Sequence, residues 1–82
     1  MTPAQCRAAR ALLDITQPQL AETAGLGLST VVDYERARRN VSTDAIGAIR
    51  FALEAGGVEF TNGEQPGVRL RKSTDSNLRP PA

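Results

Sequence analysis

The chain has 82 residues, of which 40% are hydrophobic and 23% are charged, and its formal net charge is +1. This length suits one small domain. The chain contains no histidine and a single cysteine, Cys6, which excludes internal disulfides, Ser–His–Asp and Cys–His catalytic sets, and ordinary zinc sites. We therefore expect no metal, no other cofactor and no enzymatic activity.

The sequence has no apolar run that could span a membrane, and its N-terminus lacks the apolar centre of a signal peptide. A lone thiol is typical of a reducing compartment. We therefore expect a cytoplasmic protein that makes no contact with a membrane.

The first part of the chain predicts two short helices. Thr2 can cap a helix that has Pro3 in its first turn and ends near Asp14. Its inward face carries Cys6, Ala9, Arg10 and Leu13. Residues 16–19, Thr-Gln-Pro-Gln, form a capping box that begins the second helix. Gly25 ends this helix, because glycine takes the left-handed conformation without strain.

Two further helices follow. The third runs from Leu28 to Arg36, and the fourth begins at Ser42 or Thr43 and ends at the glycines 56 and 57. Their core-facing residues are expected to be Val31, Tyr34, Ala37, Ile46, Ile49 and Leu53.

After the two glycines the pattern changes to alternation. Residues 58–61 and 68–71 alternate apolar and polar side chains around a turn-rich segment, which predicts a β-hairpin with a loop of about six residues. An isolated hairpin is only marginally stable, so its apolar side chains must pack on the helices or on another chain. These side chains are Val58, Phe60, Val68 and Leu70. The chain thus divides into a helical unit (1–57), a hairpin (58–71) and a polar tail (72–82) that we expect to be disordered.

The most informative segment is residues 17–39, where a turn with two glycines joins two short helices. Such a turn sets the second helix at a steep angle to the first, so that it is exposed and able to enter a major groove.

In this segment the sequence resembles the phage-repressor-like (Cro or XRE) helix-turn-helix family. The matching positions are Gln17, Leu20-Ala21, Ala24-Gly25, Ser29-Thr30-Val31, Glu35-Arg36, Arg38-Arg39, Arg10, Ile49 and Leu53. The resemblance covers about residues 3–55 and is more specific than a short motif. It implies a mainly α fold, in which a four-helix repressor-type helix-turn-helix domain precedes the C-terminal β-hairpin. It also implies a sequence-specific transcriptional regulator that binds double-stranded DNA.

The resemblance further implies a set of DNA-contacting residues. They are Gln17, Leu28, Ser29, Thr30, Val32, Asp33, Arg36, Arg38 and Arg39. Gln17, Arg38 and Arg39 would contact phosphates, Leu28 would lie where the third helix enters the groove, and the next residues of that helix would face bases.

The chemistry of these residues agrees with base contacts. The hydroxyls of Ser29 and Thr30 can bond to base edges, and Val32 can touch a thymine methyl group. Asp33 is unfavourable near phosphates unless it accepts a hydrogen bond from a cytosine amine. The alternative for Ser29 and Thr30 is that they only begin the helix.

Three positions depart from the family pattern. Ala37 stands where a glycine usually ends the third helix, and a left-handed alanine costs about 1–2 kcal/mol. Gly27 replaces a common capping hydroxyl, and Leu28 replaces a common polar contact.

Arg10 and Glu35 are candidates for a structural ion pair. Arg10 lies on the inward face of the first helix, and the resemblance implies that it forms a partly buried pair with Glu35. The alternative is two solvated charges, which are common on protein surfaces.

We expect the protein to act as a homodimer, because one unit of this size touches few base pairs. The hairpin is the expected dimer element, since a strand edge can pair with its counterpart in a second copy. The alternative is a module that sequesters a protein, as an anti-activator or antitoxin does, through an apolar and acidic patch of Leu28, Val32 and Asp33.

Overall fold

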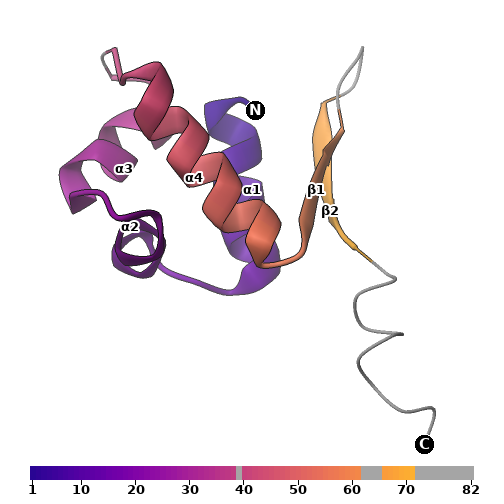
Figure 1. Ribbon diagram of the computed structural model, residues 1–82. Coiled ribbons are helices and arrows are strands. Elements are labelled where there is room, and N and C mark those ends of the chain that lie inside the picture. Colours follow the sequence, from indigo (N-terminus) through magenta and orange to yellow (C-terminus); the bar gives the residue numbers. More distant parts are fainter. Residues whose placement is uncertain (39, 62–65, 72–82) are drawn as a thin grey trace, which may run out of the picture.

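The computed structural model describes residues 1–38, 40–61 and 66–71. These residues form four helices and a two-stranded antiparallel hairpin (Figure 1). The elements are α1 (Pro3–Leu13), α2 (Gln17–Ala24), α3 (Leu28–Glu35), α4 (Thr43–Ala55), β1 (Val58–Thr61) and β2 (Gly67–Leu70). The predicted mainly α class with a C-terminal hairpin is confirmed. Residues 62–65 of the expected loop and the expected tail at 72–82 lie outside the described residues.

The boundaries differ from the predicted ones by single residues. Helix α3 ends at Glu35 with Arg36 as its cap, and β2 occupies 67–70 rather than 68–71. Ser42 is the N-cap of α4, where its hydroxyl accepts a hydrogen bond from the Ala45 amide at 3.1 Å. None of the helices in the described ranges is both long and apolar enough to cross a membrane.

Helices α1 and α2 begin with the same capping box. The Thr2 hydroxyl accepts from the Gln5 amide at 3.1 Å, and the Gln5 side-chain oxygen accepts from the Thr2 amide at 2.8 Å. Thr16 and Gln19 repeat this arrangement at 3.2 Å and 2.8 Å. Each box satisfies two backbone N–H groups that a helix start leaves without partners.

The ends of α2 and α3 use left-handed backbone. Gly25 has φ +72° at the end of α2, as predicted, and Ala37 has φ +50° just beyond α3. The Ala37 amide donates to the Tyr34 carbonyl at 3.0 Å, and the Arg38 amide donates to the Asp33 carbonyl at 3.0 Å. Alanine therefore takes the conformation that glycine would take without strain. The expectation that Ala37 faces the core is wrong, because the helix ends before it and its side chain is exposed.

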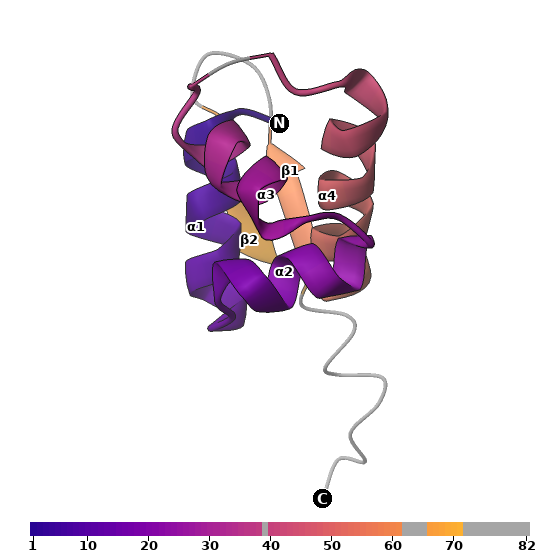
Figure 2. The same ribbon diagram turned by 90° about the vertical axis from the view of Figure 1, so that its left-hand side faces the viewer.

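A small aliphatic core lies between the four helices and the hairpin. Its buried members are Cys6, Ala9, Leu20, Ala21, Val31, Tyr34, Ile49, Ala52, Leu53 and Val58. Figure 2 shows α2 and α3 in front, α1 and α4 at the two sides, and the hairpin behind. The helix-turn-helix unit and the hairpin therefore occupy opposite sides of the molecule.

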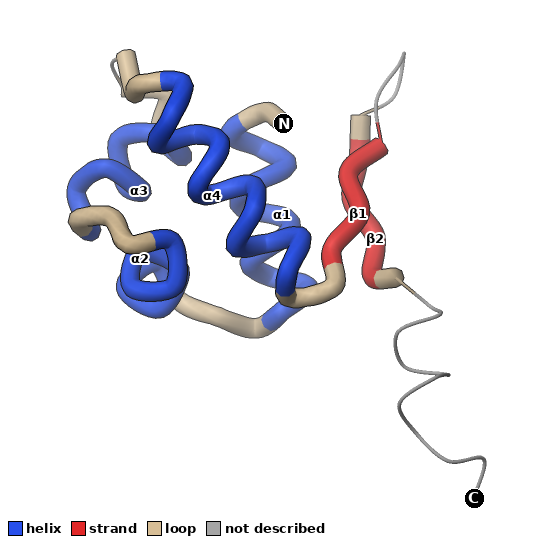
Figure 3. Tube along the Cα trace, in the orientation of Figure 1, coloured by secondary structure: helices blue, strands red, loops and turns tan. Residues whose placement is uncertain are grey.

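The apolar side chains of the hairpin share one face, because Val58 pairs with Leu70 and Phe60 pairs with Val68. This face lies against α1 and α4 (Figure 3). Val58 is 0% exposed, and Phe60 and Val68 pack on the core. The prediction that Val58 serves a dimer contact therefore needs correction, since its own helices cover it. Leu70 remains 46% exposed.

The side chain of Gln5 joins α1 to the hairpin. Its amide nitrogen donates to the carbonyls of Thr61 and Gly67, each at 2.9 Å, while its oxygen completes the capping box of α1. Gln5 is buried, and the two carbonyls belong to paired residues of β1 and β2. One side chain thus fixes both strands to the start of α1.

Replacing Gln5 tests this connection. Gln5→Ala removes three hydrogen bonds, each worth about 1 kcal/mol, and should lower the free energy of unfolding by about 3 kcal/mol. Gln19→Ala is the matched control, because it removes the same capping bond in α2 without affecting the hairpin, and it should cost about 1 kcal/mol. Urea denaturation followed by circular dichroism measures both. Equal losses would show that Gln5 does not hold the hairpin.

Candidate nucleic-acid interface

Helices α2 and α3 form a compact helix-turn-helix unit. Residues 25–27 connect them, and the Leu26 amide donates to the Ala21 carbonyl at 2.9 Å, which closes the turn. Leu20 and Ala21 of α2 are buried together with Val31 of α3.

Helix α3 has one buried face and one open face. Val31, Tyr34 and Glu35 are buried. The predicted base-contacting residues lie elsewhere on the helix: Leu28 is 46% exposed, Ser29 is exposed, and Thr30, Val32 and Asp33 are half-buried. The structure thus leaves these five residues accessible to a ligand.

The open face of α3 adjoins a shallow hollow of about 310 Å³. Thr30 and Asp33 line it together with Leu26 and residues 40–42 at the start of α4. Base-facing positions of α3 are therefore next to the segment that leads into α4.

Arginines collect at the C-terminal end of α3. Arg36 and Arg38 are exposed there, whereas Arg39 lies outside the described residues. Arg7 of α1 is also exposed, and its guanidinium donates to the Glu35 backbone carbonyl. Arg7 is not among the residues expected from the sequence to contact DNA. Its position three residues before Arg10 is the signal that could have placed it beside the end of α3.

Arg10 and Glu35 form an ion pair through two hydrogen bonds. Arg10 Nε donates to Glu35 Oε2 at 2.7 Å, and a second guanidinium nitrogen donates to Oε1 at 2.9 Å. A third nitrogen of Arg10 donates to the Ile15 carbonyl at 3.2 Å, at the start of the loop before α2. The Glu35 side chain is only 2% exposed. The alternative of two solvated charges is therefore wrong for this pair.

Two further side chains donate to the same carboxylate. Cys6 Sγ contacts Glu35 Oε2 at 3.3 Å, and Gln17 Nε2 contacts Oε1 at 3.1 Å. Gln17, expected to contact a phosphate, thus also joins the first turn of α2 to the last turn of α3. Glu35 consequently has bonding partners on both α1 and α2.

The ionisation of this cluster follows from its geometry. Burial favours a higher pKa for Glu35, but hydrogen bonds from Arg10, Cys6 and Gln17 outweigh it, so the pKa lies below its ordinary value. Burial and the nearby Glu35 charge raise the pKa of Cys6 to about 12. Hydrogen bonding to Glu35 raises the pKa of Arg10. The cluster is therefore an ionised pair with a neutral thiol as donor.

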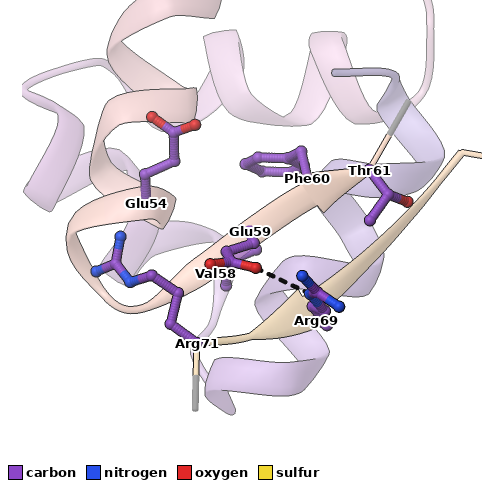
Figure 4. A pocket seen from close by; sticks show the side chains of 7 residues that line it. All are labelled: Glu54, Val58, Glu59, Phe60, Thr61, Arg69 and Arg71. Carbon is purple, nitrogen blue, oxygen red and sulfur yellow. Dashed lines mark hydrogen bonds and ion pairs between the residues drawn. The ribbon is translucent and has the colours of Figure 1, made fainter. Parts of the chain in front are cut away.

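A larger hollow, of about 440 Å³, is lined by residues of the hairpin and by Glu54 near the end of α4 (Figure 4). Glu54, Glu59, Arg69 and Arg71 line it, and Arg69 Nε donates to Glu59 Oε1 at 2.8 Å. Within the residues that the structure describes, acidic, cysteine and histidine side chains form no group able to hold a metal ion. Its size alone does not make this hollow the functional site.

Comparison with protein families supports the assignment of the α2–α3 unit. Residues 7–50 match the family described as helix-turn-helix, and this match covers more than half of the chain. The protein belongs to this helix-turn-helix family, of the Cro/C1 type also called XRE. The family comprises DNA-binding domains rather than enzymes. Comparison with curated proteins gave no match.

Removing Arg10 tests how strongly the fold depends on the buried pair. Arg10→Met leaves the Glu35 charge buried and should lower the free energy of unfolding by about 3–5 kcal/mol. The double variant Arg10→Met/Glu35→Leu should lose much less, because no buried charge is then left unpaired. Arg69→Met is the control: it breaks an exposed pair with Glu59 and should change stability by less than about 1 kcal/mol. Thermal melting of the three variants measures this, and an Arg10→Met melt equal to wild type would contradict the account.

Proposed function

We propose that this DNA-binding protein is a sequence-specific transcriptional regulator that acts on double-stranded DNA as a homodimer. The observation that carries the proposal is the open face of α3. Three buried residues hold this helix in the core while the residues able to contact bases remain accessible.

The open face has the chemistry needed for sequence readout. Ser29 and Thr30 provide hydroxyl groups that donate to or accept from base edges, and Val32 provides an apolar contact for a thymine methyl group. Asp33 accepts hydrogen bonds and therefore favours a cytosine amine. Leu28 lies in the first turn of α3, at the point where this helix enters the DNA major groove.

The two ends of the unit are suited to phosphate contacts. Arg36 and Arg38 lie at the C-terminal end of α3, and Arg7 adds a third guanidinium from α1. Gln17, in the first turn of α2, retains hydrogen-bonding capacity beyond its bond to Glu35. Contacts of this kind position a protein on the duplex, whereas base contacts give specificity.

Two copies are proposed because one α3 helix contacts few base pairs. A dimer that places two such helices in successive major grooves doubles the contacts and the specificity. The free thiol of Cys6 fits the cytoplasmic location expected from the sequence.

Leu28 favours a second candidate function. A large apolar side chain that is 46% exposed at the start of α3 also suits a protein partner. An apolar protein interface is little affected by salt, whereas phosphate binding weakens steeply as salt rises. Salt dependence therefore separates the two candidates.

The phosphate contacts are tested by removing one arginine at a time. Arg38→Ala should weaken binding to all DNA sequences about equally, and it should reduce the slope of log K against log salt by about one unit. Arg69→Ala removes the same charge from the hairpin, on the opposite side of the molecule, and should leave the slope unchanged. Fluorescence anisotropy across a salt series measures both variants. An equal loss of slope in Arg38→Ala and Arg69→Ala would mean that binding depends on the net charge of the protein and not on a specific interface.

A further inference from the structure

Phe51 is the most exposed of the large apolar side chains that the structure describes. Its side chain is 72% exposed on α4, on the side opposite to Ile49 and Leu53, which are fully buried. A single exposed apolar residue is ordinary on a protein surface. The surroundings of Phe51 therefore decide whether it has a role.

An apolar groove opens beside Phe51. It has a volume of about 360 Å³ and lies between the end of α1, α2 and the last turns of α4. Its lining residues are Leu13, Ile15, Leu20, Thr23, Ala52, Ala55 and Gly56. Ala55 follows Phe51 by four residues, so it lies on the same side of α4, one turn further along. The exposed ring and the groove are thus neighbours on one flank.

We propose that this flank is the interface between two copies of the chain, in which Phe51 of each copy enters the groove of the other. This proposal rests on the proposed function as a homodimer, and it identifies the surface through which the two copies would contact each other. In a twofold contact the same patch serves both partners, so it must be complementary to itself. An apolar side chain next to an apolar groove meets this condition when the two α4 helices lie antiparallel.

The charges around Phe51 favour a second copy as the occupant. A twofold axis brings each residue close to its own counterpart, and like charges near the axis repel one another. Gly47, Ala48 and Ala55 lie within about one turn of Phe51 on this side of α4 and are uncharged. Asp44 lies on the same side two turns before Phe51, and an antiparallel contact centred near Phe51 keeps it away from its counterpart. The neighbouring Arg50 and Glu54 pair with each other at 2.9 Å.

The two Phe51 rings would supply part of the area that a dimer contact needs. Two aromatic rings together bury roughly 300–500 Å², which is about a quarter of the total area of a standard protein interface. Gly47, Ala48 and Ala55 have small or no side chains, so two α4 helices can approach each other closely and bury further area. The flank includes none of the residues proposed to contact DNA, so both α3 helices remain free.

Two exposed apolar residues provide a matched comparison. Phe51→Ser should weaken the dimer by about tenfold or more, because a buried aromatic side chain dominates an interface of this size. Leu70→Ser, on the hairpin, should leave the dimer unchanged. Thr23→Arg changes the groove instead of the ring and should also weaken the dimer. Sedimentation equilibrium measures all three, and thermal melting checks that each variant folds.

The proposal would be overturned by a dimer that Phe51→Ser leaves unaffected or by a dimer that only Leu70→Ser weakens. It would equally be overturned by a wild-type protein that is monomeric at about 100 µM, well above the Kd of a specific dimer. A monomer that binds a different protein through Phe51 would also overturn it.

DNA-binding measurements distinguish a failure of this proposal from a failure of the proposed function. Folded Phe51→Ser should keep its affinity for a single half-site and lose the gain from a second one. Absence of DNA binding in the wild type would contradict the function without affecting the dimer result.

Discussion

The buried carboxylate of Glu35 is the constraint on which the DNA-binding unit depends. A charged group at 2% exposure is costly unless several donors surround it. Arg10 and Cys6 provide these donors from α1, and Gln17 provides one from α2. Because Glu35 is the last residue of α3, these hydrogen bonds fix the end of α3 against α1 and α2. The orientation of the open face of α3 follows from this arrangement.

The hairpin is attached to the helices by the same kind of interaction. Gln5 forms hydrogen bonds with backbone groups at the start of α1 and on both strands. In the same way, Glu35 accepts hydrogen bonds from two helices. The core is small and mostly aliphatic, so it buries little area with which to fix the angles between elements. Buried polar groups with specific partners supply that geometry, and every fully buried side-chain nitrogen and oxygen among the described residues has a hydrogen-bond partner.

Local signals predicted most of the fold, because capping boxes, glycine stops and the change to alternation are read within a few residues. Gly25 and Ser42 are examples. The Arg10–Glu35 pair was expected only through the family pattern. The bond from Gln5 to Thr61 joins residues 56 positions apart, and no local pattern indicates it. Tertiary packing likewise decided that the helices cover Val58.

The central claim is that the open face of α3 reads base sequence. Selection of bound duplexes from a random pool, with wild type and with Asp33→Ala, tests it most directly. The account predicts that wild type enriches a palindrome with half-sites about one helical turn apart. Asp33→Ala should enrich the same palindrome with a relaxed preference at one base pair of each half-site, worth about 1–3 kcal/mol. Failure of wild type to enrich any sequence, or identical sites from both proteins, would contradict the account.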